Sequence, residues 1–537
     1  MPDRILPERP DLQQYRKQAK ELARDCAAGH PAALIRVRKH HPRLRDIAPD
    51  QPRSIALADA QLVIAREHNF ASWPRFAAHI ETLHRIRSLD SLPDPASTFI
   101  EVASVDTHGW HRGGTLDYAT MILSRYPNVA TASIYAAAVL AEEATVRSFL
   151  KHDPSLATSK GGPHNWDALT YLCFSRYLRL DKSRSDAFTA TARVLLEAGA
   201  SANACWWETI DDPPRSIPET AIYGAAGVAQ HAGVTQLLLE YGADPNDEET
   251  PYHVAEGWDN TVLEMILRSG RFDQRSLATV LARKADWHDE HGLQLALQHG
   301  ADPNYKTIWN ITPFQHSIRR DTALTMIESL LEHGADPYLR NNKTGQDAVQ
   351  MAAYHGRGDL LRLFESRGFA VRFDQPLDQL IAACALADLP RARSLVTEHP
   401  ILFSELQSMG GALLARFAGV GNREGVNCLL DLGIPVDALW PEGDPYFDEA
   451  KNSTALHIAA WRARHEVVRE LISRGANVNA TDDRGRTPLQ LAVKACVDSY
   501  WKNLRKPDSV AALLAAGAAN HAIELPSGYE AVDTLLR

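Results

Sequence analysis

Two ionisable side chains suited to proton transfer stand one helical turn apart near the middle of the chain. His253 is followed by Glu256 three residues later. A carboxylate at that spacing can orient an imidazole so that it accepts a proton from a substrate. One turn of any polar helix produces the same pairing, because residues i and i+3 are neighbours on its surface. The catalytic and the structural interpretation therefore both stay open.

A denser ionisable cluster follows, and it suggests a metal ion. His288 and His291 enclose Asp289 and Glu290, and two such histidines can face one ion. A solvated helix start explains the same residues, because acidic side chains favour a helix N-terminus. The sequence offers no convincing fourth ligand, so we expect no metal and no other cofactor. The candidate catalytic residues are His253, Glu256, His288 and His316.

The common catalytic signatures are absent from the sequence. It contains no G-x-x-x-x-G-K-[ST] phosphate loop, no G-x-G-x-x-G motif and no G-x-S-x-G elbow. The zinc pattern H-E-x-x-H begins at His465 and Glu466 but has Arg469 at its fifth position. These absences weaken the familiar enzyme classes and leave open whether the protein is an enzyme.

The composition is that of a soluble protein with a substantial core. Of the 537 residues, 45% are apolar and 23% are charged. No apolar run is long enough to span a membrane, and the first residues show no signal core. Six separated cysteines without a C-x-x-C pair are typical of a reducing compartment. A net charge of −10 disfavours a nucleic-acid surface. We expect a cytoplasmic protein that binds neither nucleic acid nor a membrane.

A series of glycines punctuates the chain from residue 199 onward. An apolar residue lies four positions before each glycine, and often another lies three before, as with Leu330 and Leu331 before Gly334. We expect both leucines to be buried in the last helical turn, and the glycine to end the helix in the left-handed conformation. The series comprises Gly199, Gly242, Gly270, Gly300, Gly334, Gly368, Gly433, Gly475 and Gly517.

Turn residues and a new helix start follow each glycine. In Thr312-Pro313-Phe314-Gln315 the threonine suits a helix cap and the proline suits the first helical position. The unit resembles the ankyrin repeat, a hairpin finger plus two antiparallel helices of about 33 residues, most closely over residues 454–479. The resemblance covers roughly residues 98–537. It implies an all-α solenoid of about 11–12 repeats, in which His457 has a structural role.

The resemblance also implies that fingers and interhelical turns line a concave face. Seven of the eleven tryptophans hold such positions, among them Trp440, and two fingers are long, at residues 205–218 and 440–453. Aromatic faces beside polar groups suit a partly polar ligand, although packing under the long fingers is an alternative. The predicted ligand-binding residues are Trp166, Arg176, Tyr177, Trp206, Trp207, Trp258, Asp259, Trp287 and Trp309.

The first 90 residues differ from the rest of the chain. Four segments have helical apolar spacing without the glycine series, namely 12–27, 32–39, 55–67 and 73–86. Residues 15–20 and 64–73 are similar to a leader found on many bacterial ankyrin proteins. The predicted organisation is a helical N-terminal module at 1–90, a linker at 91–97 and the repeat array at 98–537.

Three functions are compatible with these features. We favour a binding protein that recognises a protein or peptide partner through its concave groove, because repeats offer exchangeable fingers on a shared core. The alternative is an enzyme or a receptor for a small polar or aromatic metabolite. It is suggested by the tryptophans, histidines and carboxylates concentrated in repeats three to seven, residues 164–316. A toxin, immunity or host-directed effector role rests on analogy of fold alone.

Overall fold

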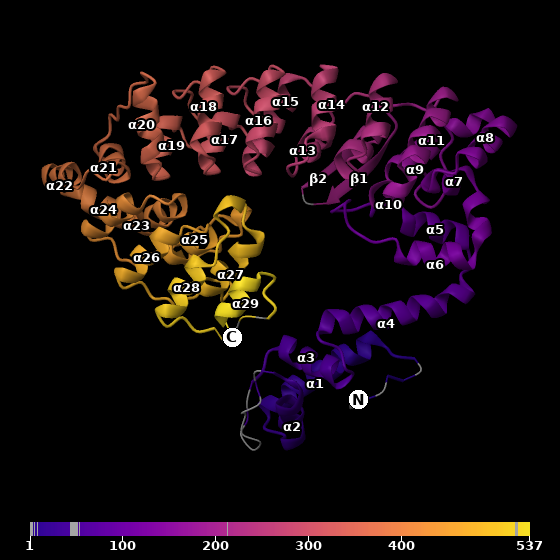
Figure 1. Ribbon diagram of the computed structural model, residues 1–537, viewed down its shortest axis with the longest axis horizontal. Helices are drawn as coiled ribbons and strands as arrows, with labels where there is room; N and C mark the ends of the chain where they lie inside the picture. Colours follow the sequence, from indigo (N-terminus) through magenta and orange to yellow (C-terminus); the bar gives the residue numbers. More distant parts are fainter. Residues whose placement is uncertain are drawn as a thin grey trace. The chain divides into compact units, whose positions relative to one another are not determined.

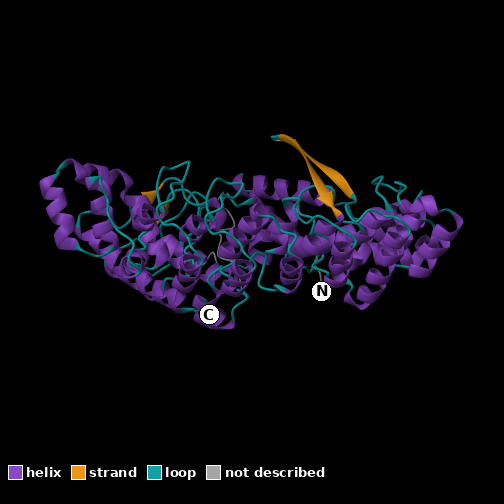
Figure 2. Ribbon diagram, turned by 90° about the horizontal axis from the view of Figure 1, so that it is seen from above, coloured by secondary structure: helices purple, strands orange, loops and turns teal. Residues whose placement is uncertain are grey.

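The structure is a computed structural model in which helices far outnumber strands (Figure 2). It describes residues 4–536 except 5, 8, 43, 45–51, 53, 212, 521, 522 and 524. The chain divides into two compact units, Met1–Ile217 and Pro218–Arg537. No helix in the described ranges is long and apolar enough to cross a membrane.

The first unit begins with four helices that share a core of their own. Asp11 caps the first helix by accepting a hydrogen bond from the backbone N–H of Gln13 at 2.8 Å. Tyr15, Leu34 and Phe76 are buried together between the helices. The predicted helices are confirmed, each to within two residues at either end. They are α1 (Leu12–Ala27), α2 (Pro31–His40), α3 (Leu57–Glu67) and α4 (Trp73–Ser88).

The remainder of the first unit consists of short helices and most of a hairpin, whose second strand runs past the unit boundary at Ile217. The helix after the N-terminal module begins at Pro95, inside the predicted linker, because Asp94 caps it and proline fits the first helical position. The helices are α5 (Pro95–Ala103), α6 (Asp117–Arg125), α7 (Ile134–Leu140), α8 (Glu143–His152), α9 (Ala168–Cys173), α10 (Arg176–Leu180) and α11 (Ser185–Glu197). The predicted long finger forms a two-stranded sheet of β1 (Cys205–Asp211) and β2 (Pro214–Thr220), the orange strands that stand out in Figure 2.

The second unit repeats one arrangement, a pair of neighbouring helices (Figure 1), and in most repeats a glycine of the series follows the second helix. It opens with the π-helix η5 (Tyr223–Val228), and its β3 (Leu439–Trp440) and β4 (Ser453–Thr454) pair antiparallel. Its α-helices are α12 (Ala232–Glu240), α13 (Glu249–Val254), α14 (Thr261–Ser269), α15 (Gln274–Asp286), α16 (Glu290–Gln298), α17 (Pro313–Arg319), α18 (Leu324–Glu332), α19 (Ala348–Tyr354), α20 (Gly358–Ser366), α21 (Pro376–Ala385), α22 (Leu389–Glu398), α23 (Ile401–Val420), α24 (Arg423–Asp431), α25 (Ala455–Trp461), α26 (His465–Ser473), α27 (Pro488–Asp498), α28 (Asp508–Ala515) and α29 (Glu530–Leu536).

The local signals of the sequence produce the expected helix ends. All nine glycines of the series have φ between 67° and 101°, the left-handed region that ends a helix. Thr312 caps α17 by accepting from the backbone N–H of Gln315 at 3.1 Å. The ring of His457 contacts the backbone oxygens of Ala480 and Arg486 at 3.1 and 3.0 Å, which confirms its structural role.

The leucine pairs before the glycines are not equally buried. Leu330 is fully buried in α18, whereas Leu331 is only half-buried, and Leu471 and Ile472 differ in the same way. The expectation that both leucines belong to the core is therefore wrong for Leu331. Successive residues of a helix point about 100° apart, so a narrow buried stripe includes one residue of the pair and leaves its neighbour at the edge.

This difference gives a test with a matched pair of variants. Leu330→Ala should lower the free energy of unfolding by about 2–5 kcal/mol, because it leaves a cavity in the helix-packing core. Leu331→Ala should cost about 1 kcal/mol or less, because part of the side chain already faces solvent. Urea unfolding followed by circular dichroism measures both. Equal losses in the two variants would contradict the assigned helix face.

Candidate functional site

The long finger at residues 440–453, here called the closing finger, folds back onto earlier repeats of the second unit. The hydroxyl of Tyr446 accepts a hydrogen bond at 3.2 Å from Nη1 of Arg283, a residue 163 positions away in sequence. The guanidinium carbon of Arg320 lies 3.3 Å from the centroid of the Tyr446 ring. The next residue of the finger is also held, because the backbone oxygen of Phe447 accepts a hydrogen bond from Nε1 of Trp461 at 2.6 Å. The closing finger thus covers part of the surface formed by α15 and α17, each the first helix of its repeat.

Beneath the closing finger lies a cavity of about 570 Å³, which we call the central cavity. A volume of this size is typical of a small-molecule site. Its walls come from α13, α15, α17, α19 and α23, from the fingers before α17 and α19, and from the closing finger itself. The charged and aromatic side chains that line it are Tyr252, Arg283, Asp286, Trp309, His316, Arg319, Arg320, Lys343, Tyr354, His355, Arg416, Trp440, Asp444, Tyr446 and Arg462.

One buried carboxylate organises this wall. Asp286 ends α15 and is 3% exposed, and it contacts Arg283, Arg320 and His316 at 2.6, 2.8 and 2.8 Å. Burial alone raises the pKa of Asp286, but the contact with His316 and the charges of Arg320 and Arg283 outweigh burial and hold the pKa well below its usual range. Asp286 is therefore an anion that fixes two guanidinium groups and one imidazole.

His316 is the predicted catalytic residue that lies in the central cavity. Burial lowers its pKa, the contact with Asp286 raises it, and the charges of Arg320 and Arg319 lower it again, with a net decrease. A neutral imidazole that donates from Nε2 to Asp286 has its lone pair on Nδ1, where it can hold a proton. The ring also stacks at 6.4 Å and 22° on Trp309, a predicted ligand-binding residue.

His253 and Glu256 are brought together as their spacing predicts. Nδ1 of His253 lies 3.2 Å from Glu256, and its Nε2 lies 3.1 Å from Glu249. Burial lowers the pKa of His253, but the two carboxylates outweigh it, so the pKa is raised. Glu256 also accepts from Nη2 of Arg283 at 2.9 Å. Glu256, held by His253, therefore supports Arg283, which lines the cavity. His253 and Glu256 themselves do not line it.

The cluster around His288 serves the start of α16. Asp289 caps this helix by accepting from the backbone N–H of Gly292 at 3.1 Å, and it pairs with Lys284 at 2.9 Å. Glu290 accepts from the Thr325 hydroxyl at 2.9 Å. These contacts fit the helix-start interpretation, because both carboxylates are engaged by the fold.

His288 itself faces a second pocket of about 450 Å³. Its ring lies 5.3 Å from that of Trp501, in the loop after α27. Burial lowers the pKa of His288 to about 4, with Arg464 and Arg462 adding to the decrease and Asp321 opposing it.

The predicted residues Trp258, Trp287 and Asp259 lie apart from the central cavity. The two indoles contact each other edge to face at 4.9 Å, and Nζ of Lys502 lies 3.1 Å from the centroid of Trp258. Asp259 accepts from the backbone N–H of Thr261 at 3.0 Å at the start of α14. Within the second unit, the predicted aromatic residues thus form two separate groups.

The remaining predicted ligand-binding residues belong to the first unit. Trp166 and Trp206 are buried and stack on each other at 5.0 Å, whereas Trp207 is 61% exposed. Arg176 donates to the backbone oxygen of Val102 at 2.9 Å and to Asp106 at 2.8 Å. Tyr177, which follows it, is also buried.

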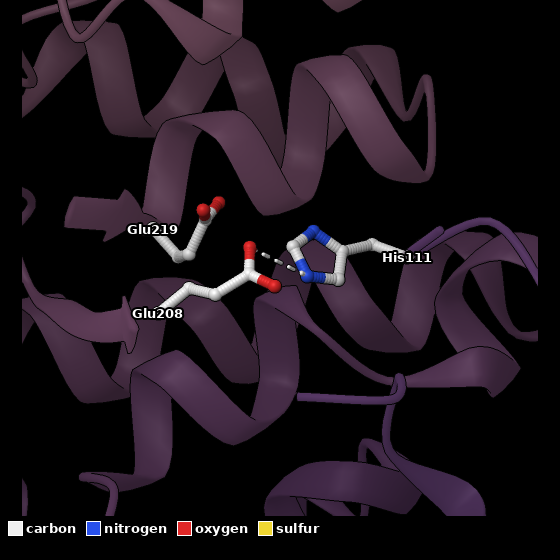
Figure 3. A group of neighbouring side chains, drawn as sticks. All are labelled: His111, Glu208 and Glu219. Atoms are coloured by element: carbon white, nitrogen blue, oxygen red, sulfur yellow. Dashed lines mark ion pairs between the residues drawn. The ribbon is translucent and has the colours of Figure 1, made fainter. Parts of the chain in front are cut away.

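Sequence reasoning did not single out a buried ion pair in the first unit. Nε2 of His111 lies 3.7 Å from Oε2 of Glu208, a residue of β1 (Figure 3). Glu208 also accepts from the backbone N–H of Gly109 at 2.8 Å. Glu219, also drawn in Figure 3, belongs to β2 beyond the boundary of the first unit. The first unit thus uses this carboxylate to hold the segment at residues 109–111.

The candidate residues also omit all five arginines of the central cavity. Alignment of the repeats on the ends of their first helices would have indicated two of them, since Arg320 and Arg462 directly follow α17 and α25. Arg416 lies outside that pattern because α23 is a longer helix than its counterparts. No local signal in the sequence marks it.

Comparison with known proteins identifies the repeats. Residues 316–365 and 410–522 match family models described as ankyrin repeats, so α17–α20 and α23–α28 belong to ankyrin repeats. With its helix pairs and glycine turns, the fold is an all-α ankyrin-repeat solenoid.

The chain is similar to parts of curated proteins and spans only a small share of their length. The chain is 29% identical over 183 residues to Protein glp-1 of Caenorhabditis elegans, covering 32% of this chain and 14% of that protein. It is 33% identical over 95 residues to Serine/threonine-protein kinase 12 of Arabidopsis thaliana, covering 18% and 17%. The human ASB11 ankyrin repeat domain aligns with 45% of this chain and 98% of its own, at 19% identity and a TM-score of 0.20.

The pKa of His288 predicts how stability depends on pH. An unfolded histidine titrates near about 6.5, whereas folded His288 titrates at about 4. As the pH falls from about 6.5 to 4, the unfolded chain binds a proton that the folded protein does not, so the free energy of unfolding decreases. The wild type should lose more stability over this window than His288→Gln, measured by urea unfolding. His291→Gln, at an exposed position, is the control, and parallel curves for wild type and His288→Gln would exclude this effect.

Proposed function

We propose that the chain is an ankyrin-repeat binding protein whose second unit is a receptor for a compact ligand in the central cavity. The observation that carries this proposal is the closing finger. Tyr446 contacts Arg283 and Arg320 on the surface formed by α15 and α17. In an open groove this surface would be free to receive a partner. The space left beneath the closing finger has the size of a small molecule.

The lining suits a ligand with at least one flat face. Trp309 is half-buried, and its ring lies 6.0 Å from Tyr252 and 6.4 Å from His316. Aromatic walls of this kind favour planar groups, while the charged residues around them fix orientation. The position of Trp309 and His316 in the cavity lining therefore supports the metabolite-receptor hypothesis. The site extends beyond the predicted range, to residue 462.

A protein or peptide partner is the second candidate, and its support lies in the first unit. Solenoids of this class generally use extended surfaces to bind other proteins. Trp110 and Trp207 are 60% and 61% exposed, and exposed tryptophans are enriched where proteins bind one another. We therefore assign the partner hypothesis to this part of the first unit.

The two candidates make different predictions for single variants. A metabolite that raises the melting temperature of the wild type should bind Trp309→Ala about 5–150-fold more weakly, because a stacking wall contributes about 1–3 kcal/mol. Trp258→Ala is the matched control, since Trp258 lies outside the cavity lining. Thermal shift against a metabolite library, followed by calorimetric titration, measures this.

A different pattern would replace the receptor by the partner candidate. If no metabolite stabilises the protein, and a purified partner loses affinity with Trp207→Ala but not with Trp309→Ala, the central cavity is not the recognition site. Equal weakening of a metabolite by Trp258→Ala and Trp309→Ala would also reject the cavity.

A further inference from the structure

We propose that the central cavity binds an oxyanion, a compact organic phosphate or carboxylate that accepts hydrogen bonds from Arg320, Arg416 and the indole N–H of Trp440. This inference rests on the proposed receptor function and names the chemical class of its ligand. It follows from three properties of the cavity lining, namely its unpaired donors, its excess of positive charge and its aromatic side chains.

Three buried donors among the lining residues have no acceptor within the described part of the chain. They are Nη1 of Arg320, Nε of Arg283 and Nε1 of Trp440. Arg320, Arg283 and Trp440 are each 5% exposed. A buried donor without a partner is costly, and the cost is larger for a charged group. All three donors belong to side chains that line the central cavity, so an occupant rich in acceptors would satisfy them once these side chains turn toward it.

The charges of the lining favour an anionic occupant over a neutral one. Five arginines and Lys343 line the cavity, but only two carboxylates do, Asp286 and Asp444. Glu256 and Glu449 pair with Arg283 and Arg462 from behind, and an excess of positive charge remains. Water can satisfy single donors, whereas an oxyanion satisfies the donors and the charge together.

Arg416 is a partly buried cation of the lining that is suited to such a ligand. It projects from α23 into the lining and is half-buried, and no carboxylate in the described ranges forms an ion pair with it. Its guanidinium carbon lies over the ring of Trp440, 5.8 Å from the centroid, and Nε1 of that indole has no acceptor among the described residues. Burial and the charges of Arg416, Arg462 and Arg319 also hold the pKa of His355 well below its usual range, so this histidine is neutral and the positive charge of the cavity comes from its arginines and Lys343.

The aromatic residues indicate what else the ligand carries. Tyr252, Trp309, Tyr354 and Trp440 line the same cavity, and their rings favour a planar or apolar group attached to the anion. Guanidinium groups bind phosphate and carboxylate by the same paired geometry. A phosphate and a carboxylate would therefore bind through the same hydrogen bonds, and the experiment below distinguishes them.

The test uses four probes on the full chain: phenyl phosphate, benzoate, inorganic phosphate and benzyl alcohol. Calorimetric titration at constant ionic strength should show that phenyl phosphate or benzoate binds at least tenfold more tightly than benzyl alcohol, since charge-assisted hydrogen bonds are the strongest available here. Phenyl phosphate as the tightest probe identifies an organic phosphate. Benzoate as the tightest identifies a carboxylate.

Variants assign the binding to the named residues. Arg416→Gln should weaken the tightest probe at least tenfold, Arg416→Lys should restore part of the affinity, and Arg372→Gln, an exposed position outside the lining, should have no effect. Melting temperatures without ligand show that each variant is folded. If Arg416→Gln does not fold, Arg319→Gln at the exposed edge of the lining takes its place, with a smaller expected loss.

Two results would overturn the oxyanion proposal. One is the absence of binding by all three anions at millimolar concentration. The other is equal binding of benzyl alcohol and the anions, unchanged by Arg416→Gln. Either result leaves the receptor function to be judged separately by the metabolite screen with Trp309→Ala and Trp258→Ala, so failure of the ligand class and failure of the cavity are distinguishable.

Discussion

The second unit depends on one buried carboxylate, that of Asp286. It holds Arg283 within its own helix, reaches His316 and Arg320 at α17, and through the two arginines positions Tyr446 of the closing finger. A buried anion is tolerated only when it is paired and hydrogen-bonded, and removal of a partner from such a group costs several kcal/mol. Neighbouring repeats and a distant finger are therefore coupled through a single ionised group.

The same network explains why the site is basic although the chain has a net charge of −10. Asp286 satisfies some of the donors of Arg283 and Arg320, but one nitrogen of each has no acceptor among the residues that the structure describes. In a low-dielectric cavity such donors interact strongly with any anion, because solvent no longer screens them. Local charge, set by which side chains meet in the fold, thus differs in sign from the charge of the whole protein.

Local features of this chain were predictable because they depend on neighbours in sequence. Helix starts at Asp11 and Thr312, and left-handed turns at the glycine series, require only a few adjacent residues. The failure at Leu331 is also local, since apolar character alone does not distinguish the centre of a buried stripe from its edge. The similarity of the first 90 residues to a bacterial leader stays a prediction.

The candidate site was harder to predict, because its residues meet only through long-range folding. Trp258, Trp287 and Trp309 were all predicted to bind ligand, yet Trp309 lines the central cavity while the other two lie against Tyr500 and Lys502. In a repeat array the stacking of successive units, and not distance along the chain, decides which fingers face one another. The closing finger is an insertion that lies across this surface, so Trp309 lines the central cavity while Trp258 and Trp287 lie outside it. The recognition chemistry of this solenoid therefore depends on its insertions, whose contacts no repeat pattern encodes.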